Sequence, residues 1–272
     1  MTSIDSTDTY TGIADLGVSL VDGVLSVTLN RPDSLNSLTA PMLSTLADTL
    51  ERAATDRRVK VVRLGGAGRG FSSGAGIGAE DQKNRASALT PDTVLLEANR
   101  AVRSIVALPK PVVAVVHGPA AGVGVSLALS CDVVLASEKA FFLLAFTKIG
   151  LMPDGGASAL VAAAIGRIRA MRMALLAERI SAADALDFGL VSAVYPADEL
   201  EAGVAKVIDT LVSGPAVALR KTKQAINAAT LTELDNAIGR ESEGQRVLVT
   251  SRDFAEGTKA FQQRRAPEFT DD

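Results

Sequence analysis

Short runs of β-branched and other apolar residues alternate with helical patterns through most of the chain, and this alternation constrains the fold more than any other feature. The runs are VLSVTLN (24–30), VKVVRLGG (59–66), PVVAVVHG (111–118), DVVLAS (132–137) and LVSAVYP (190–196). Strands that alternate with helices are typical of βαβ units and parallel sheets rather than of an all-β fold. The sequence therefore predicts an α/β protein.

Two helices are predicted between the first three of these strands. Thr39 can cap the first helix, Pro41 fits its first turn, and a second helix runs from about 92 to 107 and ends before LPKP. The apolar residues that recur on one face of the first helix are Leu43, Leu46, Leu50 and Ala53. This face is expected to be buried.

After Pro196 the pattern becomes helical almost throughout, with helices expected at about 197–213, 215–229, 231–249 and 252–265. A set of helices of this size has little core of its own, so we expect it to pack on the preceding domain or on a neighbouring subunit. The predicted organisation is a flexible leader (1–16), a core domain (17–196) and a C-terminal helical domain (197–272).

Composition excludes several functional classes. The chain has 28 basic and 31 acidic residues, and this net charge of −3 argues against a nucleic-acid partner. A single cysteine, Cys131, and a single histidine, His117, leave no material for a disulfide framework or a metal site rich in either residue, and suit the reducing cytoplasm. The first residues, MTSIDSTDTYTG, do not form a secretory signal, and no uninterrupted apolar run is long enough to span a bilayer.

Two glycine-rich stretches, GGAGRGFSSGAGIG and HGPAAGVGVS, each follow an apolar strand. Such strand-to-helix turns present backbone N–H groups to an anion. A dinucleotide fingerprint is disfavoured because GAGRGF ends on phenylalanine, and no G-K-[ST] follows to make a P-loop.

These loops belong to a longer set of motifs that resembles a known family. The motifs include TLNRPDSLNSL, KPVVAVVHGPAAGVGVSLALSCDVVLAS, KIGLMPDGGASAL and FAEGTKAFQQRRAPEF, and the similarity covers roughly residues 18–269 in the same order. On these motifs the chain is identified as a member of the enoyl-CoA hydratase/isomerase (crotonase) superfamily. The resemblance implies a spiral of ββα units, a C-terminal helical trimerisation domain, an acyl-CoA substrate, and a homotrimer or dimer of trimers.

The resemblance also implies an oxyanion hole, in which two backbone N–H groups stabilise a thioester enolate. By position these N–H groups fall on Ser73 and Val123, and one such donor is typically worth about 3 to 4 kcal/mol. The residues expected to contact the coenzyme A moiety are Arg31, Ser73, Gly74, Ala75, Gly76, Ile77, Val123 and Arg264, with Arg265 as an alternative to Arg264. No metal and no further cofactor are expected.

The chain departs from the hydratases of this family at their two catalytic glutamates. Those positions hold Ser126 and Phe146 here, and Gly76 stands where many members have an aspartate. Water addition needs one group to activate water and another to deliver a proton, so hydratase activity is expected to be weak or absent.

Moving a double bond requires only one base, and Asp154 is the candidate. Its context, GLMPDGG, is similar to that of 3,2-enoyl-CoA isomerases and 1,2-epoxyphenylacetyl-CoA isomerase. Leu151, Met152 and Phe146 are expected to desolvate Asp154 and so to raise its pKa. The alternative is a turn residue that caps a helix beginning near Gly155, a contribution of about 1 kcal/mol; the two roles are compatible.

Other interpretations stay open at this point. A generic enoyl-CoA hydratase and a non-catalytic acyl-CoA-binding protein are the main alternatives, whereas a hydrolase built on Ser126 and His117 is disfavoured because GVGVSLA is not a G-x-S-x-G elbow. Cys131 is expected to be buried. Glu80, Asp81 or Glu97 could enter the acyl pocket, although a surface location is favoured, and residues 79–90 could form a flap over the acyl chain.

Overall fold

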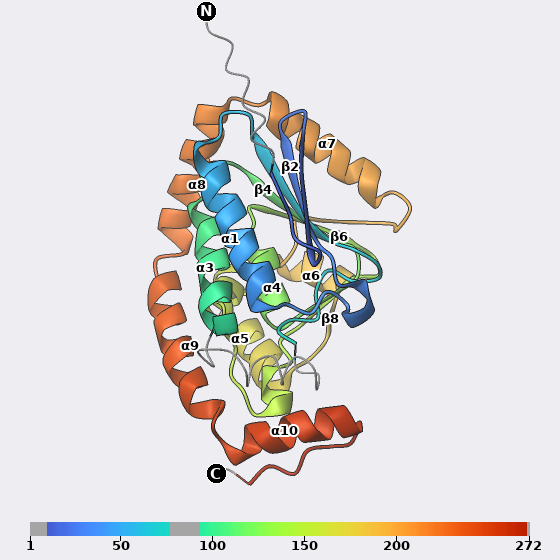
Figure 1. Cartoon of the computed structure of the whole chain (residues 1–272), viewed down its shortest axis with the longest axis vertical. Helices are drawn as coiled ribbons and strands as arrows, with labels where there is room; N and C mark the ends of the chain where they lie inside the picture. The colour runs from blue at the N-terminus through green and yellow to red at the C-terminus, as the bar shows by residue number, and fades with distance from the viewer. Residues whose placement is uncertain (1–9, 77–92, 271–272) are drawn as a thin grey trace, which may run out of the picture.

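The computed structural model describes residues 10–76 and 93–270, and its main sheet contains the five predicted strands. The order is β1-β2-β3-β4-β6-β9, with β1 antiparallel to β2 and the other neighbours parallel (Figure 1). The bounds are β1 (Leu16–Val21), β2 (Val24–Leu29), β3 (Val61–Gly66), β4 (Val112–Val116), β6 (Val133–Ser137) and β9 (Ala193–Tyr195). The predicted α/β class with parallel pairing is confirmed.

A second, smaller sheet was not predicted. It has the order β5-β7-β8 and consists of β5 (Pro119–Ala121), β7 (Phe141–Leu143) and β8 (Ile180–Ser181). In chain order, β4 and β5 precede the helix α4 (Val123–Leu129), and β6 and β7 precede the helix α5 (Ala157–Leu176). Each of these units places one strand in each sheet before its helix, which is the repeat of a ββα spiral.

Helix α1 (Ala40–Thr55) forms as its sequence predicts. The Thr39 hydroxyl accepts a hydrogen bond from the N–H of Met42 at 3.4 Å, and Pro41 lies in the first turn. Helix α3 (Thr93–Ala107) packs against α1 and ends before the predicted prolines. The residues of α1 that were expected to be buried, Leu43, Leu46, Leu50 and Ala53, are at most 1% exposed.

Both faces of the main sheet are covered, which explains why β4 is apolar without alternation. Val112, Ala114 and Val116 belong to the core beneath α1 and α3, whereas Val113 and Val115 pack with α7 (Leu200–Ser213) on the other face. Figure 1 shows α1 and α3 side by side, with α7 beyond the sheet.

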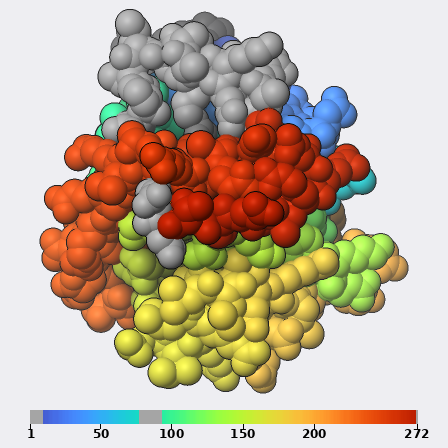
Figure 2. Space-filling model, turned by 90° about the horizontal axis from the view of Figure 1, so that it is seen from below, coloured from blue at the N-terminus to red at the C-terminus, as the bar shows by residue number. Residues whose placement is uncertain are grey.

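The remaining C-terminal helices are α8 (Ala216–Thr230), α9 (Leu234–Leu248) and α10 (Arg252–Gln263), close to the predicted ranges. Helix α9 runs down the side of the molecule in Figure 1. Helix α10 lies across the end seen in Figure 2 and packs on the 3₁₀ turn η2 (Phe146–Ile149). The division into three domains at 16/17 and 196/197 stays a prediction.

Among the residues that the structure describes, no single helix is long and apolar enough to cross a membrane. Helices α7 and α8 meet that criterion only together, and they are bent by 108° relative to each other.

Candidate active site

The two glycine-rich loops lie in direct contact. The N–H of Ser72 donates to the carbonyl of Pro119 at 3.0 Å, and the N–H of Ala121 donates to the carbonyl of Ser72 at 2.8 Å. Gly74 has a φ of +87°, and a Cβ built on it would come 2.8 Å from the carbonyl oxygen of Ala121. Glycine is needed here because any side chain would separate the two loops.

Ser73 does not supply the N–H group that was predicted. Its N–H donates to the carbonyl of Leu35 at 2.8 Å, and its hydroxyl donates to the carbonyl of Ser34 at 2.9 Å. The N–H of Ser73, which was predicted to bind the thioester oxygen, is thus already bonded within the protein. The structure therefore contradicts the prediction that Ser73 supplies a donor of the oxyanion hole.

The N–H of Ala75, two residues later, is placed differently from that of Ser73. The N–H of Leu38 donates to the carbonyl of Gly74, and the N–H of Gly76 donates to the carbonyl of Leu38. In this parallel pairing Leu38 bonds to the residues on both sides of Ala75, so the N–H of Ala75 points away from Leu38. Within residues 10–76 and 93–270, neither this N–H nor that of Val123 has an acceptor.

The segment PDGG does not start the helix as predicted. The N-cap of α5 is Gly156, which has a φ of +77° and no side-chain cap. The carboxylate that serves the first N–H groups of α5 comes from α9: Glu241 accepts from the N–H of Gly156 at 2.6 Å and from the N–H of Ser158 at 2.8 Å. The side chain of Asp154 is therefore not the cap of this helix.

Asp154 is held by groups from two other elements. The side-chain amide of Gln245 donates to Oδ2 of Asp154 at 2.8 Å and to the carbonyl of Met152 at 2.9 Å. From α4, the hydroxyl of Ser126 donates to the backbone carbonyl of Asp154 at 2.9 Å. The residue is half-buried and its Oδ1 atom is buried.

The predicted site residues from distant parts of the chain converge around this segment. A Cβ built on Gly155 would come 2.8 Å from Cγ2 of Val123 and 3.1 Å from Oγ of Ser126. A Cβ built on Gly122 would lie 3.7 Å from Cζ of Phe146, whose ring is buried. Asp154 is thus a neighbour of the second glycine-rich loop, which also contacts the apolar ring at position 146.

A second carboxylate, that of Glu241, lies close to this site and is buried. It is 1% exposed, and burial raises its pKa, although hydrogen bonds from Ser158 and Gly156 act in the opposite direction. Both of its carboxylate oxygens accept hydrogen bonds from the start of α5, so Glu241 stabilises this helix end and is not a candidate for proton transfer. Among residues 10–76 and 93–270, no three acidic, histidine or cysteine side chains are grouped to hold a metal ion.

The arginines expected near the coenzyme phosphates are placed differently from one another. The guanidinium of Arg31 donates to the carbonyl of Ser37 at 3.0 Å and to its hydroxyl at 2.7 Å. Arg264 is exposed at the C-terminal end of α10, and its alternative, Arg265, forms an ion pair with Glu256. Their contact with a coenzyme stays a prediction.

Several other candidates can be placed or set aside. Nε2 of His117 donates a hydrogen bond to the carbonyl of Gly68 at 3.0 Å. Cys131 is buried, as predicted, and that burial raises its pKa. Glu97 pairs with Arg100 on α3 at 3.4 Å. Ile77, Glu80, Asp81 and the expected flap at 79–90 lie outside the described residues.

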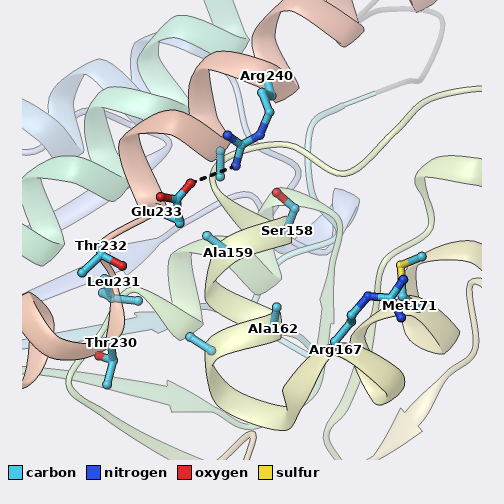
Figure 3. A pocket seen from close by; sticks show the side chains of 12 residues that line it. Ser158, Ala159, Ala162, Arg167, Met171, Thr230, Leu231, Thr232, Glu233 and Arg240 are labelled. Carbon is cyan, nitrogen blue, oxygen red and sulfur yellow. Dashed lines mark hydrogen bonds and ion pairs between the residues drawn. The ribbon is translucent and has the colours of Figure 1, made fainter.

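A pocket of about 760 Å³ opens elsewhere, between α5, α9 and the turn before α9. Ser158, Ala159 and Arg167 of α5 line this space, and Figure 3 shows the ion pair of Glu233 with Arg240 on the side opposite to α5. None of the predicted site residues lines this pocket. It is distinct from the arrangement around Asp154.

Sequence reasoning missed two residues that hold this segment, Glu241 and Gln245, and it named Ala75 only as a contact of the coenzyme A moiety. Glu241 and Gln245 are four residues apart in a predicted helix, so the sequence could have placed them on one face. Their partners lie 83 to 93 positions earlier in the chain, and helical spacing gives no information about such distant contacts.

Comparisons with known proteins agree with this architecture. Residues 20–272 match the family described as enoyl-CoA hydratase/isomerase. The chain is 38% identical to the 1,2-epoxyphenylacetyl-CoA isomerase of Escherichia coli, with 91% of this chain and 95% of the relative covered. It is 34% identical to the 2,3-dehydroadipyl-CoA hydratase of the same organism, with 94% and 99% covered. A crystal structure of an enoyl-CoA hydratase from Mycobacterium avium subsp. paratuberculosis matches with 70% identity and a TM-score of 0.89 over 96% of this chain and 100% of that one.

Proposed function

The chain belongs to the enoyl-CoA hydratase/isomerase family, and we propose that it is an acyl-CoA isomerase that uses Asp154 as its proton shuttle. In this proposal the N–H groups of Ala75 and Val123 form the oxyanion hole. The single observation that carries the proposal is that the Asp154 carboxylate is not used as a helix cap, because Glu241 fills that role.

The residues around Asp154 support a reaction that uses one catalytic acid rather than the two that hydration needs. Ser126 uses its hydroxyl on the Asp154 carbonyl, and Phe146 contributes only an apolar ring. Neither can activate water as a carboxylate does. A carboxylate next to an oxyanion hole matches the needs of proton transfer along the acyl chain, and the other acid described near this segment, Glu241, is occupied by the start of α5.

The proposed reaction conserves every atom of the substrate. The Asp154 carboxylate removes the proton from the carbon α to the thioester, and the electron pair of that C–H bond moves into a dienolate whose charge rests on the thioester oxygen. The N–H groups of Ala75 and Val123 stabilise that oxygen. The carboxylic acid then returns its proton to the γ carbon, so that the double bond has moved and the base is regenerated. These steps require no metal or redox cofactor.

Hydration is the second candidate, because several of the similar proteins are named hydratases, among them the two reported above. The hydratase from Mycobacterium avium subsp. paratuberculosis is 70% identical to this chain, so the alternative rests on a particular similar protein as well as on the family as a whole. It would require an activated water in a site where positions 126 and 146 carry no acid.

The deciding experiment compares isomerisation of a 3-enoyl-CoA with hydration of a 2-enoyl-CoA by the same preparation. We expect isomerisation to be the faster reaction and Asp154→Asn to lower its kcat by about 100- to 10,000-fold, since general acid–base catalysis contributes that much. Asp187→Asn, at an exposed acid in α6 (Ala182–Phe188), is the matched control and should leave kcat unchanged.

Two results would contradict the proposal. One is strong hydration that survives Asp154→Asn, which would identify a hydratase with another base. The other is tight binding of several acyl-CoA thioesters without turnover and without any effect of Asp154→Asn, which would identify a binding protein.

The assembly and location of the protein are further parts of the proposal. We infer a trimer or a dimer of trimers. Large apolar side chains on α5 support this assembly, because Ile168, Leu175 and Leu176 are 62 to 76% exposed in the single chain and exposed apolar groups of this kind mark contact surfaces. The one cysteine of the sequence supports a reducing, cytoplasmic location.

A further inference from the structure

Gln245 donates two hydrogen bonds from its side-chain amide, one to the carboxylate of Asp154 and one to the backbone nearby. Nε2 donates to Oδ2 of Asp154 at 2.8 Å and to the carbonyl oxygen of Met152 at 2.9 Å. The amide therefore links the carboxylate to the backbone on the other side of Pro153. This contact fixes the rotation of the carboxylate relative to the chain that carries it.

The orientation of this amide is determined by its partners. Both contacts are with acceptors, the carboxylate and a carbonyl, so a flipped amide would place its own oxygen against two other oxygens. Oε1 of Gln245 consequently has a single possible direction, where it is buried and has no donor among residues 10–76 and 93–270. A buried acceptor without a donor lowers stability, and an apolar side chain would avoid that loss. The amide group is thus better explained by the two donors it provides than by packing.

The backbone around Asp154 does not depend on Gln245 alone. Glu241 lies one helical turn earlier on the same face of α9 and holds Gly156 and Ser158 at the start of α5. Ser126 holds the carbonyl of Asp154 from α4. Loss of the Gln245 amide should therefore release the carboxylate while leaving the path of the chain intact.

We propose that Gln245 is a positioning residue for Asp154: by holding Oδ2, its amide fixes the direction of the carboxylate that takes the proton from the acyl chain. This inference rests on the proposed function of Asp154. It makes α9 part of the active site, although no residue of α9 takes up or releases the proton.

The test uses the full chain and the variants Gln245→Met and Gln245→Glu. Methionine keeps a similar length without a donor, and glutamate keeps the shape but replaces the donor by a carboxylate. The control is Ser242→Ala, on the same helix, where the hydroxyl meets Asn99 and not the segment 152–158. Steady-state isomerisation of a 3-enoyl-CoA gives kcat and KM separately, and crystal structures without ligand give the position of the Asp154 carboxylate.

We expect both Gln245 variants to lower kcat by about 100-fold with KM changed less than about threefold, because misplacement of a reacting group by about 1 Å costs that much. Ser242→Ala should stay within about twofold of the wild type. In the Gln245→Met crystal, the carboxylate should leave its position while the contact of Glu241 with Gly156 persists.

The inference is overturned if kcat is unchanged, or if KM rises while kcat stays constant, since the amide would then shape acyl binding instead. It is also overturned if the carboxylate keeps its position in Gln245→Met. That crystallographic result does not require turnover. A wild-type protein that fails to isomerise would refute the proposed function, and the crystals would still decide whether Gln245 positions Asp154. If Gln245→Met does not fold, Gln245→Glu carries both measurements.

Discussion

Replacement of Lys223 by methionine should destabilise the protein strongly, because this lysine joins α8 to the core through a buried ion pair. Its Nζ lies 2.9 Å from Oδ2 of Asp132 and donates to the carbonyl of Ile105, in the last turn of α3, at 2.9 Å and to the carbonyl of Lys110 at 3.2 Å. The side chains of Lys223 and Asp132 are only 7% and 20% exposed.

The magnitude follows from what the variant leaves behind. Methionine preserves the apolar stem, so the loss is that of the charge and its hydrogen bonds. Removal of one partner of a buried pair costs about 3 to 5 kcal/mol. Asp132 keeps the N–H of Val112 as a donor at 2.7 Å and has some contact with solvent, which places the loss near the lower value, about 3 kcal/mol at neutral pH.

The pH dependence gives a second, independent check. Burial raises the pKa of Asp132 above its ordinary value of 3.8, and Lys223 counteracts this rise. Without Lys223 the pKa in the folded state should be higher still, so the folded variant binds a proton that the unfolded chain releases. The variant therefore loses stability as pH rises through that window, and the difference from wild type should be smaller at pH 5 than at pH 8.

Urea unfolding followed by circular dichroism measures the free energy of unfolding at both pH values. Lys221→Met, at an exposed lysine of the same helix, is the matched control and should change it by less than about 0.5 kcal/mol. A loss for Lys223→Met below 1 kcal/mol, or one that is equal at pH 5 and pH 8, would refute the reasoning.

Two further predictions concern Glu241 and the assembly. Burial raises the pKa of Glu241, so the folded state binds a proton on this carboxyl more tightly than the unfolded chain does, and the wild-type free energy of unfolding should fall as pH rises above the ordinary pKa of 4.5. In Glu241→Gln this part of the pH dependence should be absent from the free energy measured by urea unfolding. An unchanged pH dependence would contradict the prediction. Light scattering of the purified chain should give the mass of three or six chains. Leu175→Lys should lower the measured mass towards that of one chain, because the charge would enter an apolar contact. A wild-type mass of one chain would exclude this assembly.

Local rules predicted most of the elements of the fold. Thr39 and Pro41 marked the start of α1, and the prolines of LPKP marked the end of α3. The short strands β5, β7 and β8 were missed because two or three residues, such as Ile180–Ser181, are too few to show alternation.

The errors in the site have a common physical origin in backbone direction. N–H groups two residues apart point to the same side of a regular extended segment, so alternation alone does not separate Ser73 from Ala75. Gly74, with a φ of +87°, interrupts the extended backbone between them, and the carbonyl of Leu35 takes the N–H of Ser73. The sequence does not contain that information. Similarly, the glycines at 155 and 156 carry the chain through positive φ and delay the start of α5, which leaves Asp154 outside the helix that it was expected to cap.

The C-terminal helices contribute to the site as well as to the periphery of the molecule. On helix α9, Glu241 accepts hydrogen bonds from the start of α5 and Gln245 donates one to Asp154. The same helix therefore supplies the cap of α5 and holds the carboxylate that does not serve as that cap. Because α8 is joined to the core through Lys223, the helix that precedes α9 is anchored by a separate buried contact. The acid in PDGG acquires its surroundings from a segment about 90 residues later in the chain. For this reason the local motif alone is compatible with a cap, a turn or a base, and the position of α9 excludes the first of these.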